Sequence, residues 1–352
     1  MEDSSSNAAL THRRKAFLAL KTKPVSVSPQ HLVQMETFST SSQTPLVITP
    51  NFANVNLADW IAHNRALLSE KLAIHGGLLF RGFALHSQED FQHVLQATEI
   101  ELISYNESST PRKQLSKQVY TSTEFPADQT IALHNELSTA ATLPLSVWFF
   151  ALQPAQKGGE TPIADIRNVY KRLSGAVQSE FKKRGWMLIR NYNDGFGLSW
   201  QDAFHTMDRA IVEEYCRNNA IAFEWKDQDR LRTRQVRPAI AIHPKTGETV
   251  WFNHLVFWHV SSLEATVREA FLRDFGAYNL PYETYYGDGG RISDSVVEEI
   301  RAAYREEKVV FVWEPGDLLM LDNMLVAHGR QPYVGPRRIL VGMGEPYTRT
   351  DL

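Results

Sequence analysis

The chain has 352 residues, of which 43% are hydrophobic and 22% are charged, and its formal net charge is −3. This is the composition of a globular protein long enough to bury a large core. Because basic residues are not in excess, we expect neither nucleic acid nor an anionic membrane surface as a partner. No apolar run has the length needed to cross a bilayer, and no apolar stretch of signal-peptide length opens the chain.

Cys216 is the only cysteine, so an intrachain disulfide is impossible. This cysteine usage fits a reducing compartment, and we expect a cytoplasmic protein. Residues 207–219 around it have a helical pattern, and no neighbouring base would activate the thiol. We therefore interpret Cys216 as a buried structural residue rather than a nucleophile.

Residues 1–45 are polar and rich in Ser and Thr. They predict a partly flexible N-terminal segment before a single domain over residues 46–352. Apolar residues at helical spacing then predict a helix over residues 57–74. Ser87, followed three residues later by Asp90, resembles a capping box that opens a second helix.

Short strand-like runs and helical segments alternate along the rest of the chain. Helices are expected at residues 166–185, 207–219, 262–275 and 293–306. Strands are expected at residues 78–83, 145–152, 309–312, 318–321 and 339–343, with a hairpin at 236–250. Strands joined by short turns, with helices before and between them, predict a mainly β fold with helical insertions (α+β). The expected type is a β-sandwich or jelly roll.

The strongest chemical signal is the pair His134 and Glu136. On an extended segment, residues two apart project to the same side, so these two side chains are expected to point together. Two histidines and one carboxylate on one face of an ion are the ligands of non-haem Fe(II) oxygenases. The third ligand is expected from His328, far along the chain. The alternative for Glu136 is a strand carboxylate that faces solvent.

A second group of candidates consists of Thr161, in a Gly-Gly-Glu-Thr run, and the neighbours Arg337 and Arg338. A guanidinium binds a carboxylate through two parallel hydrogen bonds, and a threonine hydroxyl can donate a third. An Fe(II) site beside such groups suits a dicarboxylate that chelates iron with its other end, namely 2-oxoglutarate, with dioxygen as the second co-substrate. Neighbours on a strand face opposite sides, so the sequence leaves open which arginine binds.

Several motifs together carry a family resemblance. They are residues 120–128, 133–136, 154–165, 231–235, 247–253 and 321–329. With them the sequence resembles the taurine dioxygenase/TfdA-like superfamily of Fe(II)/2-oxoglutarate oxygenases, and within it the group around the syringomycin-biosynthesis hydroxylase. The resemblance implies a double-stranded β-helix with His134, Glu136 and His328 as iron ligands. It also implies that Thr161 and one of Arg337 or Arg338 bind the distal carboxylate of 2-oxoglutarate.

Two positions narrow the reaction that the resemblance implies. Halogenases of this chemistry carry a small residue at the second ligand position, so Glu136 favours hydroxylation or another oxidation. Gly342 stands four residues after Arg338, where taurine-type enzymes carry a second arginine for the sulfonate. A sulfonate substrate is therefore not expected.

Four further residues are candidates for contacting the substrate: Asn106, Arg232, Asn253 and His254. A structural role is the alternative for each of them. Arg232 would otherwise pair with acidic groups at the surface. Asn253 and His254 would otherwise pack within the aromatic stretch over residues 251–259.

These features predict an iron- and 2-oxoglutarate-dependent dioxygenase of natural product biosynthesis. The expected substrate is an amino acid or amino-acid-derived small molecule, free or tethered to an acyl or peptidyl carrier protein. The expected reaction is hydroxylation of an unactivated C–H bond. Desaturation, epoxidation or ring formation at the same centre is the alternative outcome. A non-catalytic jelly-roll module that binds a metal or ligand is the alternative from another class.

Overall fold

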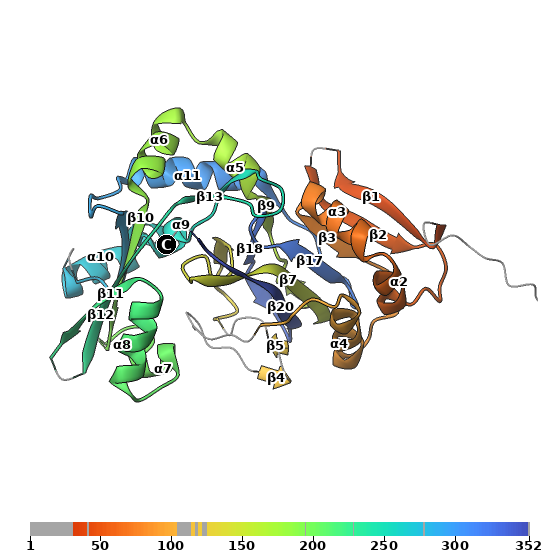
Figure 1. Ribbon diagram of the computed structural model, residues 1–352, viewed down its shortest axis with the longest axis horizontal. Helices are drawn as coiled ribbons and strands as arrows, with labels where there is room; N and C mark the ends of the chain where they lie inside the picture. The colour runs from red at the N-terminus through yellow and green to blue at the C-terminus, as the bar shows by residue number, and fades with distance from the viewer. Residues whose placement is uncertain are drawn as a thin grey trace, which may run out of the picture.

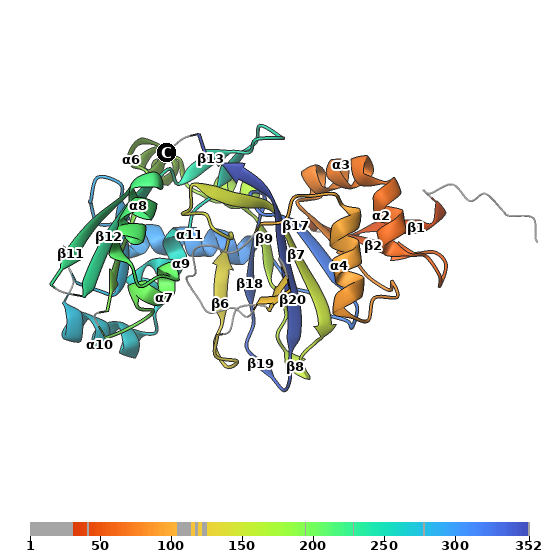
Figure 2. The same ribbon diagram turned by 60° about the horizontal axis from the view of Figure 1, so that its bottom comes forward.

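The computed structural model describes residues 31–40, 42–103, 114–116, 119–121, 125–193, 195–227, 229–276 and 279–350 (Figure 1). A central pair of β-sheets lies between two other parts of the molecule. On one side are the N-terminal helices, and on the other is a separate four-stranded sheet with its own helices (Figure 2). Within the described residues, no helix is both long and apolar enough to cross a membrane.

The larger central sheet has eight strands. Their order is β1 (Val33–Ser39), β2 (Ser42–Pro50), β3 (Gly77–Phe80), β17 (Leu318–Asp322), β7 (Thr142–Gln153), β20 (Arg338–Thr348), β5 (Val119–Thr121) and β4 (Gln114–Ser116). β7 and β20 run antiparallel through the middle of the molecule. Residues 143–151 of β7 are all buried, because both faces of the sheet are covered at this point.

The smaller central sheet carries the residues of greatest chemical interest. Its strands, in order, are β16 (Lys308–Val309), β9 (Ile163–Asp165), β18 (Val326–Arg330) and β6 (Ile131–His134). Two short strands, β8 (Lys157–Gly158) and β19 (Tyr333–Val334), pair beside it. Apolar side chains from β7, β9, β17, β18 and β20 form one continuous core with the helices that cover it. This arrangement is the predicted jelly roll, mainly β with helical insertions.

Three helices cover the outer face of the larger sheet: α2 (Leu57–His63), α3 (Arg65–His75) and α4 (Gln88–Ala97). The single helix predicted over residues 57–74 is wrong, because the chain breaks at Asn64 between α2 and α3. The Asn64 side chain donates to the Trp60 carbonyl at 2.7 Å, a local bond that competes with helix continuation. The predicted capping box is confirmed, with Ser87 and Asp90 each bonding the backbone N–H of the other.

The separate four-stranded sheet has the order β11 (Ile221–Lys226), β12 (Arg230–Arg237), β10 (Trp186–Tyr192) and β15 (Tyr282–Tyr286). The remaining elements are α5 (Ile166–Arg172), α6 (Gly175–Arg184), α7 (Trp200–Phe204), α8 (Arg209–Asn218), β13 (Ile240–Ile242), β14 (Thr249–Trp251), α9 (Leu255–Trp258), the 3-10 helix η2 (Val260–Ser262), α10 (Ala265–Phe275) and α11 (Asp294–Glu307). The short helix α9 contacts β10 and β15 and also β6. It therefore joins this sheet to the smaller central sheet.

Two strand predictions need correction. The hairpin predicted over residues 236–250 is shorter, since only β13 and β14 pair across its turn. Residues 236 and 237 belong to β12 in the separate sheet instead. The strand predicted over residues 309–312 is reduced to the pairing of Val309 in β16, because Val310 and Val312 leave the sheet and are 39% and 70% exposed.

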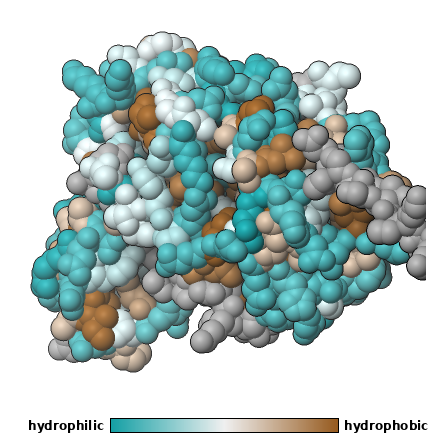
Figure 3. All heavy atoms as spheres, turned by 45° about the vertical axis from the view of Figure 1, so that its right-hand side comes forward, coloured by the Kyte–Doolittle hydropathy of each residue, from teal (hydrophilic) through white to brown (hydrophobic). Residues whose placement is uncertain are grey.

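The outer surface is largely polar. On the face in Figure 3, hydrophobic residues form separate spots within a mainly hydrophilic surface. Isolated apolar side chains of this kind are normal and do not by themselves mark a binding surface. Cys216, in contrast, is buried within α8, as the sequence predicted.

Candidate active site

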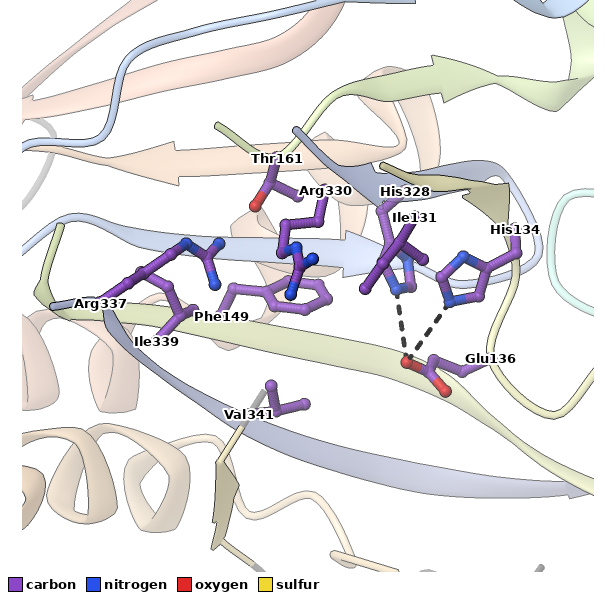
Figure 4. A pocket seen from close by; sticks show the side chains of 11 residues that line it. Ile131, His134, Glu136, Phe149, Thr161, His328, Arg330, Arg337, Ile339 and Val341 are labelled. Atoms are coloured by element: carbon purple, nitrogen blue, oxygen red, sulfur yellow. Dashed lines mark ion pairs between the residues drawn. The ribbon is translucent and has the colours of Figure 1, made fainter. Parts of the chain in front are cut away.

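Three potential metal ligands meet at one face of the smaller central sheet. His134 ends β6, His328 lies in β18, and the two are direct cross-strand partners. Opposite residues of an antiparallel pair project to the same face, so both imidazoles point the same way. Glu136 Oε1 lies 3.4 Å from His328 Nε2 and 4.0 Å from His134 Nε2 (Figure 4). The chain therefore brings together the three groups that the sequence singled out.

Glu136 reaches this position through a turn rather than along an extended strand. β6 ends at His134, and Leu137 has a positive φ of 52°. Asn323, in the turn between β17 and β18, accepts the Glu136 N–H at 2.8 Å and donates to the Glu136 carbonyl at 2.8 Å. The Asn135 side chain in turn donates to the Asn323 carbonyl at 2.7 Å. These reciprocal bonds fix the carboxylate relative to β18.

The donor set fits a divalent metal ion. The Nδ1–H of His134 donates to the Ala132 carbonyl at 2.8 Å, which leaves a lone pair on Nε2 toward Glu136. Glu136 is 3% exposed and His328 is 4% exposed. A carboxylate buried beside two imidazoles is costly unless a cation or proton compensates its charge. Donor atoms this close together can share one ion at bond lengths of about 2.0–2.2 Å.

A second polar group lies at the other end of the same pocket (Figure 4). Thr161, Arg330 and Arg337 line this end, and the ring of Phe149 lines the pocket together with them and the triad. The Trp313 indole N–H donates to the Thr161 hydroxyl oxygen at 3.1 Å. That bond leaves the hydroxyl proton of Thr161 for donation to another acceptor.

Arg337 is held in the pocket by a close approach to Gly159. Its Nε–H donates to the Gly159 carbonyl at 3.0 Å. Gly159 has a φ of +75°, and an added Cβ would lie 3.0 Å from that Nε, so glycine suits the position. Burial, and then the charge of Arg330, lower the pKa of Arg337 to about 10. Two guanidinium groups in one buried pocket create a positive potential that a carboxylate would neutralise.

The structure separates the two neighbouring arginines. Arg337 lines the pocket, whereas Arg338 begins β20 and is exposed. Gly342 lies on the face of β20 that packs against α4, where an added Cβ would meet side chains of that helix. The residue four places after Arg337 is Val341, which lines the pocket. The pocket thus has an apolar side chain at this position.

Of the predicted substrate residues, His254 lies beside the metal ligands. Its ring stacks on that of His134, with centroids 5.2 Å apart. Its Nδ1 is 2.9 Å from the Ser138 hydroxyl. Burial, and then the neighbouring His134, lower the pKa of His254 to about 3, so its imidazole is neutral near pH 7. His254 is therefore suited to hydrogen bonding rather than to binding as a cation.

The other three predicted substrate residues are placed differently. Asn253 is buried and bonds to the backbone of Ala239 and Leu255, so it supports the start of α9. Arg232 lies on the face of β12 that points away from α9, because it alternates with residues that face this helix. The structure therefore does not bring Arg232 to the metal ligands. Asn106 lies outside the described residues.

Four supporting residues were missed by sequence reasoning: Phe149, Trp313, Asn323 and Arg330. Asn323 and Arg330 lie close to His328 in the sequence, and that proximity was the available signal. Phe149 packs edge-on against the His328 ring at 4.8 Å. Phe149 and Trp313 gave no signal, because only contacts between segments distant in sequence bring them to the site.

Comparisons with known proteins agree with this geometry. A family model described as taurine catabolism dioxygenase TauD, TfdA family, matches residues 40–343. Dapdiamide synthesis protein DdaC of Enterobacter agglomerans is 40% identical over 300 residues, which cover 85% of this chain and 91% of that protein. A clavaminate synthase-like protein of Arabidopsis thaliana is 28% identical, with 86% of this chain and 94% of that protein covered.

Solved structures show the same fold. PvcB of Pseudomonas aeruginosa aligns with a TM-score of 0.53 at 15% identity, covering 91% of this chain and 92% of that one. A second PvcB structure, described as an Fe, alpha-ketoglutarate-dependent oxygenase, aligns with a TM-score of 0.52 at 14% identity, covering 92% and 93%. With the His134, Glu136 and His328 cluster, these findings show an Fe(II)/2-oxoglutarate-dependent oxygenase, and the chain belongs to the TauD/TfdA family.

Proposed function

We propose that His134, Glu136 and His328 hold one ferrous ion, and that the enzyme hydroxylates a C–H bond of an amino-acid-derived small molecule. The observation that carries this proposal is the convergence of these three side chains at one end of a pocket whose other end is cationic. A metal site alone would suit many proteins. A metal site facing a buried guanidinium and a threonine hydroxyl suits a co-substrate that chelates at one end and is anionic at the other.

The two ends of the pocket would orient 2-oxoglutarate. Arg337 and Thr161 would bind its distal carboxylate, and its keto-acid end would then face the imidazoles. The bond from Arg337 Nε to Gly159 fixes the plane of the guanidinium before the co-substrate arrives. Such preorganisation lowers the entropy lost on binding. Arg338 has no part in this proposal, because it is exposed and does not line the pocket.

Bound iron supplies the activation of dioxygen, coupled to oxidative decarboxylation of 2-oxoglutarate to succinate. The surrounding protein excludes water from that reaction. Ile131, Phe149, Ile339 and Val341 provide apolar walls between the two polar ends (Figure 4). Asn323 and Asn135 keep the Glu136 carboxylate in position, and the Ala132 carbonyl keeps His134 in the tautomer that presents Nε2.

The relative named for dapdiamide synthesis, at 40% identity, supports a substrate from natural product biosynthesis. We propose an intermediate of natural product biosynthesis, either a free amino-acid derivative or one bound to a carrier protein. Desaturation, epoxidation or ring formation remains the second candidate outcome, since the position of the substrate relative to iron decides it. We further propose one catalytic domain over residues 46–352 and a cytoplasmic location, which a single buried cysteine suits.

The test measures succinate formed from 2-oxoglutarate, with and without Fe(II), against a panel of amino-acid derivatives and their carrier-bound thioesters. Wild-type protein should form succinate only with Fe(II), and His134→Ala and His328→Ala should form none. Succinate release that persists in both variants would refute the ligand assignment. Product mass then separates the outcomes, because hydroxylation or epoxidation adds one oxygen atom whereas desaturation removes two hydrogens.

A further inference from the structure

Arg190, in β10, is a half-buried cation whose contacts in the described part of the chain are with aromatic rings. Its guanidinium carbon lies 4.7 Å from the ring centroid of Tyr192 and 5.4 Å from that of Trp258. No hydrogen bond or ion pair joins its guanidinium group to any other described residue. A guanidinium carries five N–H donors. Rings on its faces leave those donors in its own plane, where a planar oxyanion could accept them.

Other donors lie on the same face of the separate sheet. Arg190 pairs with Thr233 of β12 on one side and with Tyr282 of β15 on the other. Gln235 is two residues along β12 from Thr233, so its side chain projects to the same face. Gln235 is 6% exposed, and its Nε2 is buried without a hydrogen-bond partner among the described residues. A buried amide donor on the same sheet face as a guanidinium without an acceptor points to a ligand rich in acceptors.

This donor group is connected to the metal ligands through α9. Trp258 packs against Phe257 at 4.9 Å, and Phe257 packs against His134 at 5.6 Å. With the 5.4 Å contact of Arg190, these steps place the guanidinium no more than about 16 Å from His134. An extended peptide covers about 3.3–3.6 Å per residue, so a molecule of two to five residues in length could reach both. His254, Phe257 and Arg190 all keep part of their surface accessible.

We propose that Arg190, with Gln235 and Thr233, binds a free carboxylate of the substrate at the end remote from the oxidised carbon. This inference rests on the proposed function, because it names the substrate class of the same site. The planar fork of arginine matches a carboxylate with two parallel hydrogen bonds, and the Gln235 amide adds a third donor. The substrate is therefore an elongated acid, such as an N-acyl amino acid or a short peptide. Its apolar or neutral portion lies along Phe257 and Trp258.

The experiment uses the full chain loaded with Mn(II) and the 2-oxoglutarate analogue N-oxalylglycine. N-acyl amino acids and dipeptides are titrated by calorimetry as free acids and as the matching C-terminal amides. Wild-type protein should bind the preferred acid at least tenfold more tightly than its amide. Arg190→Gln should reduce that preference to less than twofold, and Arg190→Lys should retain part of it, since the charge remains without the planar fork.

The matched control is Arg234→Gln. Arg234 lies in β12 on the opposite face of the same sheet and pairs with Glu224, so its loss should leave the preference for acids intact. The proposal is overturned if no acid of the panel binds wild-type protein better than its amide, or if Arg190→Gln keeps the preference. It is also overturned if Arg190 affects only phosphate-bearing ligands such as acyl-pantetheine phosphates.

A separate measurement distinguishes this result from failure of the proposed function. Slow 2-oxoglutarate consumption with Fe(II) and no substrate depends on the triad and Arg337, not on Arg190. Arg190→Gln should therefore match wild-type protein in this assay while losing the preference for acids. If wild-type protein consumes no 2-oxoglutarate, the proposed function fails, whatever the calorimetry shows.

Discussion

Asn323 supports the metal site through backbone groups rather than through the metal. Its side chain, 1% exposed, bonds both the N–H and the carbonyl of Glu136 and also donates to the Pro144 carbonyl at 2.9 Å. Asn323→Ala leaves these buried groups without partners, and each such group costs about 1–3 kcal/mol. With three such groups, we expect a loss of at least about 3 kcal/mol in the free energy of unfolding, measured by urea denaturation.

The same substitution should weaken Mn(II) binding, since Glu136 is no longer fixed relative to β18. Loss of an outer supporting group typically costs about 10- to 100-fold in metal affinity. Asn51→Ala is a suitable control, because Asn51 also bonds a backbone carbonyl but lies exposed and far from the site. Equal Mn(II) affinity in Asn323→Ala and Asn51→Ala would contradict this role.

Arg337 and Arg338 provide a matched pair of substitutions at neighbouring positions. Arg337→Lys removes the planar fork from the pocket and is expected to raise the KM for 2-oxoglutarate about 10- to 100-fold, equivalent to about 1.5–3 kcal/mol. Arg338→Lys changes an exposed side chain and should leave that KM within about twofold. Steady-state succinate formation at varied 2-oxoglutarate measures both. A larger effect at Arg338 would show that the pocket assignment is wrong.

The contrast between these two arginines shows what the sequence could and could not predict at single residues. The convergence of His134, Glu136 and His328 was predictable, because the ligand chemistry and the family motifs restrict the choice of residues. Which of the two arginines enters the pocket was not predictable, because this depends on the register of β20 against β7. That pairing contains an irregularity at Arg338 and Ile339, which no local pattern reveals.

At the scale of elements, long apolar or strongly periodic segments were predictable, whereas β18 was not. β7, β17 and β20 are rich in apolar residues, and α10 and α11 have clear helical patterns. β18 reads Val-Ala-His-Gly-Arg, which lacks a strand signature, yet it holds His328 and Arg330. Its partners in β6 and β9 determine its conformation. Residues of the candidate site occupy positions where a strand would usually carry β-branched or aromatic side chains.

A buried acid and base connect β15 with η2. Glu283 Oε1 lies 3.9 Å from His259 Nε2 and accepts the backbone N–H groups of Val260 and Thr284. Burial raises the pKa of Glu283 to about 7 and lowers the pKa of His259 to about 4. Both groups are therefore favoured in their neutral forms by the fold. Their effects on stability oppose one another as the pH changes.

The direction in which each group changes stability with pH follows from the number of protons bound in the folded and unfolded chains. Between pH 4.5 and about 7, the folded chain keeps a proton on Glu283 that the unfolded chain has lost, so stability falls as pH rises. Between about pH 4 and 6.5, the unfolded chain keeps a proton on His259 that the folded chain lacks, so stability rises with pH. The two contributions largely cancel in the wild-type protein.

Glu283→Gln removes the pH-dependent contribution of the Glu283 carboxyl group. It keeps an oxygen that can accept the two backbone N–H groups. The free energy of unfolding of this variant, relative to wild type, should therefore rise by about 2 kcal/mol between about pH 4.5 and 6.5. Urea unfolding of both proteins across this range measures the difference. Parallel stability curves for the two proteins would contradict the assigned pKa of Glu283.

At the scale of the whole molecule, α9 is the structural link between the separate sheet and the jelly roll. It places His254 and Phe257 against His134 on one side and Trp258 against Arg190 on the other. The jelly roll carries His134, Glu136 and His328, and the separate sheet carries the proposed carboxylate site around Arg190. The sequence predicted the first from its motifs. The sequence did not predict the separate sheet, because the pairing of β10 with β12 and β15 joins segments that are distant in sequence.

The metal site joins distant parts of this fold, so metal binding is expected to stabilise the whole chain. Mn(II) at a free concentration 100 times its Kd adds about 2.7 kcal/mol to the free energy of unfolding. For a chain of this size the corresponding rise in Tm is about 3–4 °C, and EDTA should reverse it. His328→Ala should abolish the Mn(II)-dependent rise. His254→Ala should retain it, because His254 stacks on a ligand without being one. An unchanged rise in His328→Ala, measured by thermal unfolding, would show that the ion binds elsewhere.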